Sequence, residues 1–222
     1  MSEENDTFTR TFELEARKNV LTLCQQNIGD VSCVVWDAAL VLAKYLDTCC
    51  RDNRLGGDWL RGKKIVELGA GVGCVGMTAA CLGAHVTLTD LDSTLPLLQR
   101  NIELNEDQWR TTGGTACARV LEWGNDIPLD LSYDIIVLAD CVYYTKSIKP
   151  LLKTLQLLCE RNPEACAFLS QEERDTPGQI PVWKEFLNEL NEKFEIEHVP
   201  LSEQHPTYSS EDIHLMKLTG LR

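Results

Sequence analysis

The chain has 222 residues, of which 44% are hydrophobic and 25% charged, and its formal net charge is −13. This length is enough for one domain with a full hydrophobic core, so we expect a single domain spanning residues 1–222. The acidic charge argues against a nucleic-acid partner, because phosphate binding needs a basic face, and it suits a basic protein surface as substrate, although solubility alone explains it equally well.

The ten cysteines include no C-x-x-C pair, which argues against a zinc ribbon, a redox motif or another metal site. The start MSEENDTFTR is acidic and polar and has no signal-peptide pattern. No stretch is long and apolar enough to span a membrane. We therefore expect buried free thiols in a reducing, cytoplasmic environment.

Three segments precede the glycine-rich stretch in the middle of the sequence. Residues 8–25 alternate between apolar and polar in two runs, which predicts an N-terminal β-hairpin whose role is a lid or an edge. From Trp36 to Leu46 the sequence has helical periodicity and good helix formers. Residues 49–62 are polar and contain glycine, which predicts a surface loop.

The rest of the chain is organised around Lys63–Gly76, KKIVELGAGVGCVG. The apolar pair Ile65-Val66 predicts a buried strand, and the glycines after it allow a sharp turn and a close approach of a ligand to the main chain. Residues 74–82 are apolar and alanine-bearing, which indicates a helix. Strand, glycine turn and helix form the first half of a nucleotide-binding α/β unit.

After this unit, strands and helices alternate. Strands are expected at 84–89, 116–121, 134–139, 165–169, 194–201 and 212–218, helices from 92 or 93 to about 105, over 148–160 and over 179–193, and loops at 106–114 and 130–133. Alternation predicts a doubly wound, Rossmann-like sheet, mostly parallel, with helices on both faces. The last two strands have no helix between them, which predicts an antiparallel strand at one edge of this seven-strand sheet.

The glycine turn is compatible with two ligand chemistries. Residues 71–76 fit the dinucleotide fingerprint G-x-G-x-x-G, and residues 69–73 fit the G-x-G-x-G turn of S-adenosylmethionine (SAM) enzymes. Glu67 favours SAM, because a carboxylate sits badly beside a pyrophosphate and well beside a sulfonium and an α-amino group. A turn that binds nothing, with Glu67 as an ordinary acid, is the remaining alternative.

Ligands of such sheets bind beyond the carboxyl ends of the strands. The residues at those ends, and so the candidate site, are Glu67, Gly69, Ala70, Gly71, Asp90, Trp123, Ala139 and Asp140. Asp90 follows the turn at the distance where an acid meets a ribose hydroxyl, although it could also be a helix cap. Trp123 could border an adenine or be a rim tryptophan.

Asp140 and Tyr143 are the candidate catalytic pair. Methyl transfer needs a nucleophile that is aligned with its lone pair free, and desolvation helps a lysine amine to lose its proton. A carboxylate can hold that amine, and an aromatic wall favours a methylated ammonium. The alternative is that Asp140 caps the next segment and Tyr143 only packs.

Several stretches together resemble one family. VVWDAALVLAKYL, VELGAGVG, LEWG, ADCVYY and SEDIHLMKL resemble the seven-β-strand protein-lysine methyltransferases of the methyltransferase-like 21 group, over about Val31 to Leu218. Within the group, DCVYY, KPLLKTL and YSSEDIH look most like the branch that methylates valosin-containing protein, an AAA ATPase. The hairpin and residues 168–179 match the family pattern less closely.

The resemblance implies roles for individual residues. It implies that Trp36, Gly69, Ala70, Gly71, Asp90, Trp123 and Ala139 contact SAM and that Asp140 and Tyr143 form a D-x-x-Y motif required for activity on lysine. The implied function is SAM-dependent N-methylation of a lysine in a folded protein, with valosin-containing protein as the expected substrate. The alternatives are another chaperone or a translation factor as substrate, or a SAM-binding module without catalysis.

Overall fold

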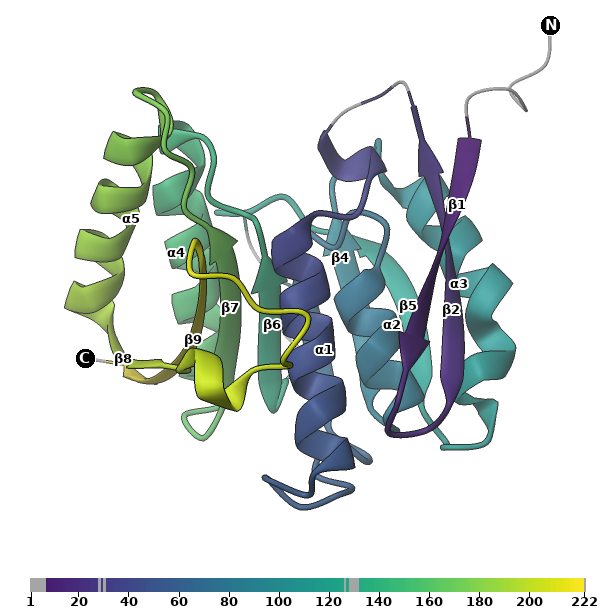
Figure 1. The fold of residues 1–222 in the computed structure, drawn as a ribbon. Helices are drawn as coiled ribbons and strands as arrows, with labels where there is room; N and C mark the ends of the chain where they lie inside the picture. Colours follow the sequence, from purple (N-terminus) through teal and green to yellow (C-terminus); the bar gives the residue numbers. More distant parts are fainter. Residues whose placement is uncertain (1–6, 28, 30, 126, 128–131, 222) are drawn as a thin grey trace, which may run out of the picture.

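The computed structural model describes residues 7–27, 29, 31–125, 127 and 132–221. These residues form a seven-stranded sheet with helices on both faces and a separate two-stranded hairpin (Figure 1). The strands are β1 (Thr7–Leu14), β2 (Asn19–Gln26), β3 (Lys64–Leu68), β4 (His85–Asp90), β5 (Thr115–Val120), β6 (Ile135–Ala139), β7 (Cys166–Glu172), β8 (Phe194–His198) and β9 (Ile213–Leu221). The α-helices are α1 (Asp37–Arg51), α2 (Cys74–Cys81), α3 (Leu95–Arg110), α4 (Thr145–Arg161) and α5 (Gln179–Lys193), with short 3-10 turns η2 (Val31–Cys33) and η3 (Leu201–Glu203).

The order of the large sheet is β5-β4-β3-β6-β7-β9-β8, and the first five strands in this order are parallel. This confirms the predicted fold class. The strand that runs against the others is β9, and it lies one place inside the edge, between β7 and β8. The connection from β8 to β9 needs no helix because the two strands are antiparallel neighbours.

The sheet is buried on both faces, which explains its apolar strands. Successive side chains of a strand point to opposite faces. On one face Ile65, Val86, Ile135 and Val137 pack with the hairpin, α1, α2 and α3. On the other face Val66, Leu68, Ile136 and Leu138 pack with α4 and α5.

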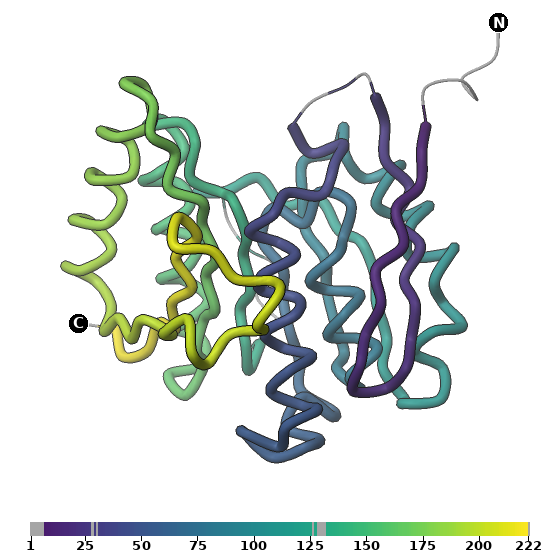
Figure 2. Tube along the Cα trace, viewed as in Figure 1, coloured from purple at the N-terminus to yellow at the C-terminus, as the bar shows by residue number. Residues whose placement is uncertain are grey.

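The N-terminal hairpin runs beside α3 in the tube view (Figure 2). Side-chain amides of α3 fix it there. Asn101 accepts a hydrogen bond from the backbone N–H of Cys24 at 2.7 Å and donates to the carbonyl of Cys24 at 3.0 Å. Asn105 makes the same pair of bonds with Thr22, at 2.8 and 2.9 Å. Asn101 also donates to the carbonyl of Val72 at 3.0 Å, so the hairpin is connected to the glycine turn.

The bounds of helices α1 and α3 differ from the sequence prediction. Helix α1 runs to Arg51, and Cys49 and Cys50 are buried, so the loop expected over 49–62 begins later. Helix α3 begins after Thr94, without a side-chain cap from residue 92 or 93, and runs to Arg110. It replaces the first part of the loop expected over 106–114 because Trp109 reaches the core. Of the loop expected at 130–133, residues 130 and 131 lie outside the described residues.

All ten cysteines carry free thiols. Within the described ranges, no helix has the length and hydropathy needed to cross a membrane. The same residues contain no group of three or more histidine, cysteine, aspartate and glutamate side chains arranged to hold a metal ion.

Candidate active site

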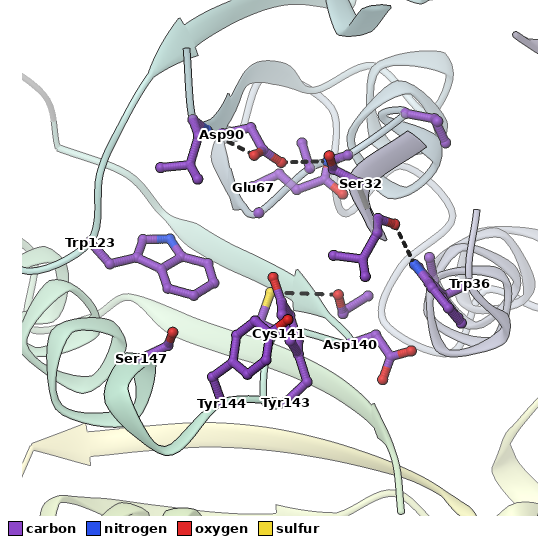
Figure 3. Close-up of a pocket in the computed structure, with 18 of the residues that line it drawn as sticks. Ser32, Trp36, Glu67, Asp90, Trp123, Asp140, Cys141, Tyr143, Tyr144 and Ser147 are labelled. Carbon is purple, nitrogen blue, oxygen red and sulfur yellow. Dashed lines mark hydrogen bonds between the residues drawn. The ribbon is translucent and has the colours of Figure 1, made fainter. Parts of the chain in front are cut away.

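A cavity of about 890 Å³ opens at the carboxyl ends of the parallel strands (Figure 3). Its volume lies in the range of small-molecule sites, and its place is where open α/β sheets bind ligands. Its lining contains all ten residues predicted from the sequence: Trp36, Glu67, Gly69, Ala70, Gly71, Asp90, Trp123, Ala139, Asp140 and Tyr143. The structure therefore brings together residues that are more than a hundred positions apart in the chain.

The glycine turn presents bare backbone to the cavity. Gly69, Gly71 and Gly73 have φ values of +65°, +51° and +86°, which L side chains rarely adopt. A Cβ on Gly71 would lie 3.1 Å from the carbonyl oxygen of Ser32, and one on Gly69 would lie 3.0 Å from the ring of Trp123. No side chain fits at either position without movement, so a ligand can approach the main chain.

Asp90 is held by the backbone around the turn. Its Oδ2 accepts a hydrogen bond from the N–H of Gly71 at 2.8 Å, and its Oδ1 accepts one from the N–H of Leu91 at 2.7 Å. Each carboxylate oxygen can accept more than one hydrogen bond. Asp90 can therefore take the two hydroxyl groups of a ribose while its orientation stays fixed by the main chain.

Glu67 lies deep under the turn and is 3% exposed. Its Oε2 accepts a hydrogen bond from the N–H of Gly76 at 2.8 Å, which ties the end of β3 to α2. Burial raises the pKa of Glu67 from 4.5 to about 8. The carboxyl is then largely protonated at neutral pH. The preference of Glu67 for a cationic ligand, which the sequence predicted, therefore applies only when a nearby cation stabilises the charged carboxylate.

Asp140 is buried at the end of β6 and has a left-handed φ of +55°. Its Oδ1 accepts a hydrogen bond from Nε2 of Gln171 at 2.8 Å, and its Oδ2 lies 2.6 Å from a guanidinium nitrogen of Arg174. Burial raises the pKa of Asp140, and Arg174 opposes this rise. The positive φ is strained for a residue with a side chain, and such strain is found at functional sites.

Aromatic side chains form the wall beside Asp140 (Figure 3). The rings of Tyr143 and Tyr144 pack edge to face with centroids 4.7 Å apart. The carbonyl of Tyr143 accepts a hydrogen bond from Gln179 at 3.1 Å, which fixes the loop against the start of α5. On Tyr144, the ammonium of Lys146 lies 5.3 Å from the ring centroid. This wall already holds one cation through its aromatic face.

Trp36 and Trp123 lie on opposite sides of the cavity (Figure 3). Trp36, directly before α1, is 40% exposed, and its indole N–H donates to the carbonyl of Val31 at 2.7 Å. Helical periodicity alone placed Trp36 at the start of a helix, whereas the family resemblance placed it in the site, and in the structure it lines the cavity. Trp123 is half-buried, and its ring lies over Gly69.

Several lining residues were not predicted from the sequence, among them Ser32, Lys146 and Arg174. Arg174 comes from the segment after β7, which runs to Glu172 and not to 169. The rule that sites lie after strand ends would have found this segment if the end of the strand had been placed correctly. Ser32 could not be found in this way, because it lies in the 3-10 turn before α1.

The lining matches the chemical groups of SAM. Its methionine, ribose and adenine parts fit four features of the lining, which are glycines with no room for a Cβ, an aspartate oriented by backbone amides, a buried glutamate and an indole ring. The side of the cavity around Asp140 carries a carboxylate and several aromatic rings, which are the groups that hold an amine or ammonium. The lining therefore suits SAM on one side of the cavity and an amine on the other.

Comparison with known protein families gives a match over most of the chain. A family model described as "Lysine methyltransferase" matches residues 15–193. EEF1A lysine methyltransferase 3 of Xenopus tropicalis is 36% identical over 189 residues, which cover 82% of this chain and 77% of that protein. Protein N-lysine methyltransferase METTL21A of Danio rerio is 35% identical over 192 residues, which cover 84% of this chain and 77% of that protein.

Comparison with solved structures supports the same fold. A 16S rRNA N2 G1207 methyltransferase from T. Thermophilus, solved with AdoMet and guanosine, superposes with a TM-score of 0.62. The two chains share 17% identity over 97% of this chain and 51% of the other. At this identity the likeness concerns the fold.

Proposed function

We propose that this chain, which belongs to the lysine methyltransferase family and is a SAM-dependent protein-lysine N-methyltransferase, methylates a lysine of EEF1A. In this proposal Asp140 and Tyr143 hold the acceptor amine. The observation that carries the proposal is the buried carboxylate of Asp140 in a cavity it shares with the glycine turn and aromatic rings. EEF1A is the substrate named for a relative that covers most of this chain.

We assign the two halves of the cavity as follows. The turn at Gly69, Ala70 and Gly71, with Glu67, Asp90, Trp123 and Ala139, binds the cofactor, and Trp36 contacts the cofactor while it also borders the acceptor side. When bound, SAM supplies a methyl group on a sulfonium, an excellent leaving group. Asp140 accepts hydrogen bonds from the lysine amine and orients its lone pair, and the wall of Tyr143 excludes water, which favours the neutral amine.

The two candidate substrates have different support. The motifs DCVYY, KPLLKTL and YSSEDIH resemble the branch that methylates valosin-containing protein. The relatives reported above have other names, and one names EEF1A, so the comparisons favour a translation factor over that reading. Both substrates are therefore tested together, with EEF1A as the expected one.

The test is a labelling experiment with methyl-labelled SAM. The purified protein is incubated with recombinant EEF1A, with valosin-containing protein and with a cell lysate, and labelled lysines are identified by mass spectrometry. We expect label on EEF1A that is lost in Asp140→Asn. Asp107→Asn is the matched control, because it removes the same charge from the exposed surface of α3 and should keep the activity.

Each outcome separates substrate from chemistry. Label on valosin-containing protein or on a chaperone in the lysate would keep the reaction and replace the proposed substrate. Label that persists in Asp140→Asn would reject the assigned role of Asp140. No label on any protein, with SAM still bound, would reject catalysis and support a binding module.

A further inference from the structure

Arg174 reaches into the acceptor side of the cavity from the segment after β7. Its guanidinium lies 2.6 Å from Oδ2 of Asp140, which is 3% exposed at its side chain. Its Cζ lies 5.2 Å from the centroid of the Trp36 ring. The same guanidinium nitrogen that contacts Asp140 also lies 2.8 Å from Oε2 of Glu172.

These contacts are the ones that an incoming lysine would need. A lysine ammonium is stabilised by a desolvated carboxylate and by the face of an aromatic ring, and Arg174 already has both, from Asp140 and Trp36. The carboxylate of Asp140 lies on the Trp36 side of the cavity (Figure 3). One cation position is thus defined by two residues of the cavity lining, and a side chain of the protein itself occupies it.

We propose that Arg174 is an internal competitor of the acceptor lysine, which occupies the amine position between Asp140 and Trp36 until a substrate lysine displaces it. This inference rests on the role of Asp140 proposed above. Arg174 then determines specificity, because a lysine enters only when the surrounding substrate surface contributes enough binding to displace the guanidinium. Free amines and loosely bound lysines are rejected.

The structure provides a second position for the displaced guanidinium. Glu172 pairs with Arg174 and is 31% exposed at its side chain, whereas Asp140 is buried. Arg174 can therefore give up Asp140 and keep a carboxylate partner nearer the solvent. Gln171 does not need to move, since its hydrogen bond goes to the other oxygen of Asp140.

The first test removes the charge of Arg174. Arg174→Met keeps much of the side-chain length without the cation, and Arg110→Met is the matched control because Arg110 is an exposed arginine in an ion pair on α3. We expect the KM for EEF1A, and its Kd measured without SAM, to fall about three- to tenfold in Arg174→Met only. Unchanged or weaker acceptor binding, while the wild-type enzyme methylates EEF1A, would overturn the inference.

The ionisation of Asp140 must be controlled in this test. Burial raises the pKa of Asp140, Arg174 and the backbone N–H of Glu172 lower it, and the negative charge of the Glu172 carboxylate raises it. Removal of Arg174 raises the pKa, so the acid limb of the kcat/KM profile should move to higher pH in Arg174→Met. Acceptor KM values are therefore compared above this limb, where Asp140 is ionised in both enzymes.

The second test needs no external substrate. In Arg174→Lys the ammonium nitrogen lies where the Cζ of arginine lies, since both are the fifth side-chain atom. After loss of a proton to solvent, its lone pair forms the N–C bond while the S–CH₃ bond breaks and the bonding pair leaves on S-adenosylhomocysteine. We expect SAM-dependent methylation of residue 174, detected by peptide mass spectrometry.

The two tests distinguish this inference from the proposed function. A methyl group on residue 174 that disappears in the Arg174→Lys, Asp140→Asn double variant supports the inference even if EEF1A is not the substrate. An unmethylated residue 174 in a variant that still methylates an external protein would place Arg174 outside the amine position. No methylation of any protein by the wild-type enzyme would instead be a failure of the proposed function.

Discussion

Two aspartates face the same cavity, and their carboxylates are held in different ways. Asp90 accepts hydrogen bonds from two backbone N–H groups, of Gly71 and Leu91. Asp140 is held mainly by two side chains, Gln171 and Arg174. Backbone donors cannot leave without unfolding of the turn, whereas side chains change rotamer on a fast timescale.

This difference separates two sides of the cavity. On the fixed side, around Asp90, backbone groups hold the carboxylate, and on the exchangeable side, around Asp140, a side chain that holds the carboxylate can be replaced. A cofactor has one structure, and a site that is organised before binding loses little entropy when it binds. An acceptor lysine arrives on a large protein surface and must be chosen among many lysines. A carboxylate with a displaceable partner on that side gives a means of discrimination that a carboxylate fixed by backbone would lack.

The largest effect should come from Asp140→Asn. The substitution keeps the shape but removes the charge, so we expect kcat/KM for methyl transfer to fall about 10²- to 10⁴-fold. The Kd of SAM, measured by calorimetry, should change little, because Asp140 is assigned to the acceptor side. A loss of SAM affinity as large as the loss of rate would erase the distinction between the two sides.

Gly71→Val should break the fixed side. The new side chain meets the carbonyl of Ser32 and requires a φ of +51°, and we expect SAM affinity to fall by about 100-fold. Gly113→Val is the matched control, because Gly113 has a φ of +79° with no heavy atom within 4 Å of the new Cβ. Equal losses of SAM affinity in both variants would mean that strain, and not filling of the turn, is responsible.

Gln171→Met should loosen the exchangeable side. Gln171 donates to Asp140 and accepts from the N–H of Val142 at 2.9 Å, so its loss frees the loop that carries Asp140. We expect kcat to fall about tenfold with unchanged SAM affinity. Gln99→Met, on the exposed surface of α3, should leave both constants unchanged, and a kcat equal to that of the wild type would show that Gln171 does not position Asp140.

Glu67→Gln should have the smallest effect on turnover, and its effect should appear in the pH dependence of stability. The pKa of Glu67 rises from 4.5 to about 8 on folding, so the folded state takes up a proton and stability falls as pH rises between these values. The wild type should lose on the order of 5 kcal/mol of unfolding free energy across this window, at about 1.4 kcal/mol per pKa unit, and Glu67→Gln should not lose it. Urea unfolding at several pH values measures the free energy of unfolding, with the exposed Glu106→Gln as control. An equal dependence of this free energy on pH in all three proteins would contradict the burial argument.

The fixed side of the cavity could be predicted from the sequence more fully than the exchangeable side. Gly69, Gly71 and Asp90 follow apolar strands at fixed spacings, and local chain geometry therefore brings them together. Asp140 could be placed at a strand end, but its left-handed backbone and its partners could not be predicted. Those partners depend on how far β7 extends and on how the following loop packs.

Trp36 illustrates the same limit. Its place before a helix was visible in the sequence, but its exposed position at the cavity depends on the 3-10 turn before it and on the hydrogen bond to Val31. The later ends of α1 and α3 have a similar cause, since tertiary packing of Cys50 and Trp109 extends helices whose polar residues predicted loops. Periodicity locates elements well and locates their ends less well.

The docking of the hairpin on α3 also bears on how separate copies of the chain behave. A two-stranded ribbon exposes unpaired N–H and C=O groups along its outer edges, and these can pair with strands of other molecules. The amides of Asn101 and Asn105 bind those groups of Cys24 and Thr22 as a neighbouring strand would. One edge of the ribbon is thereby closed to intermolecular β-pairing, and replacement of both asparagines would turn β2 into a template for aggregation.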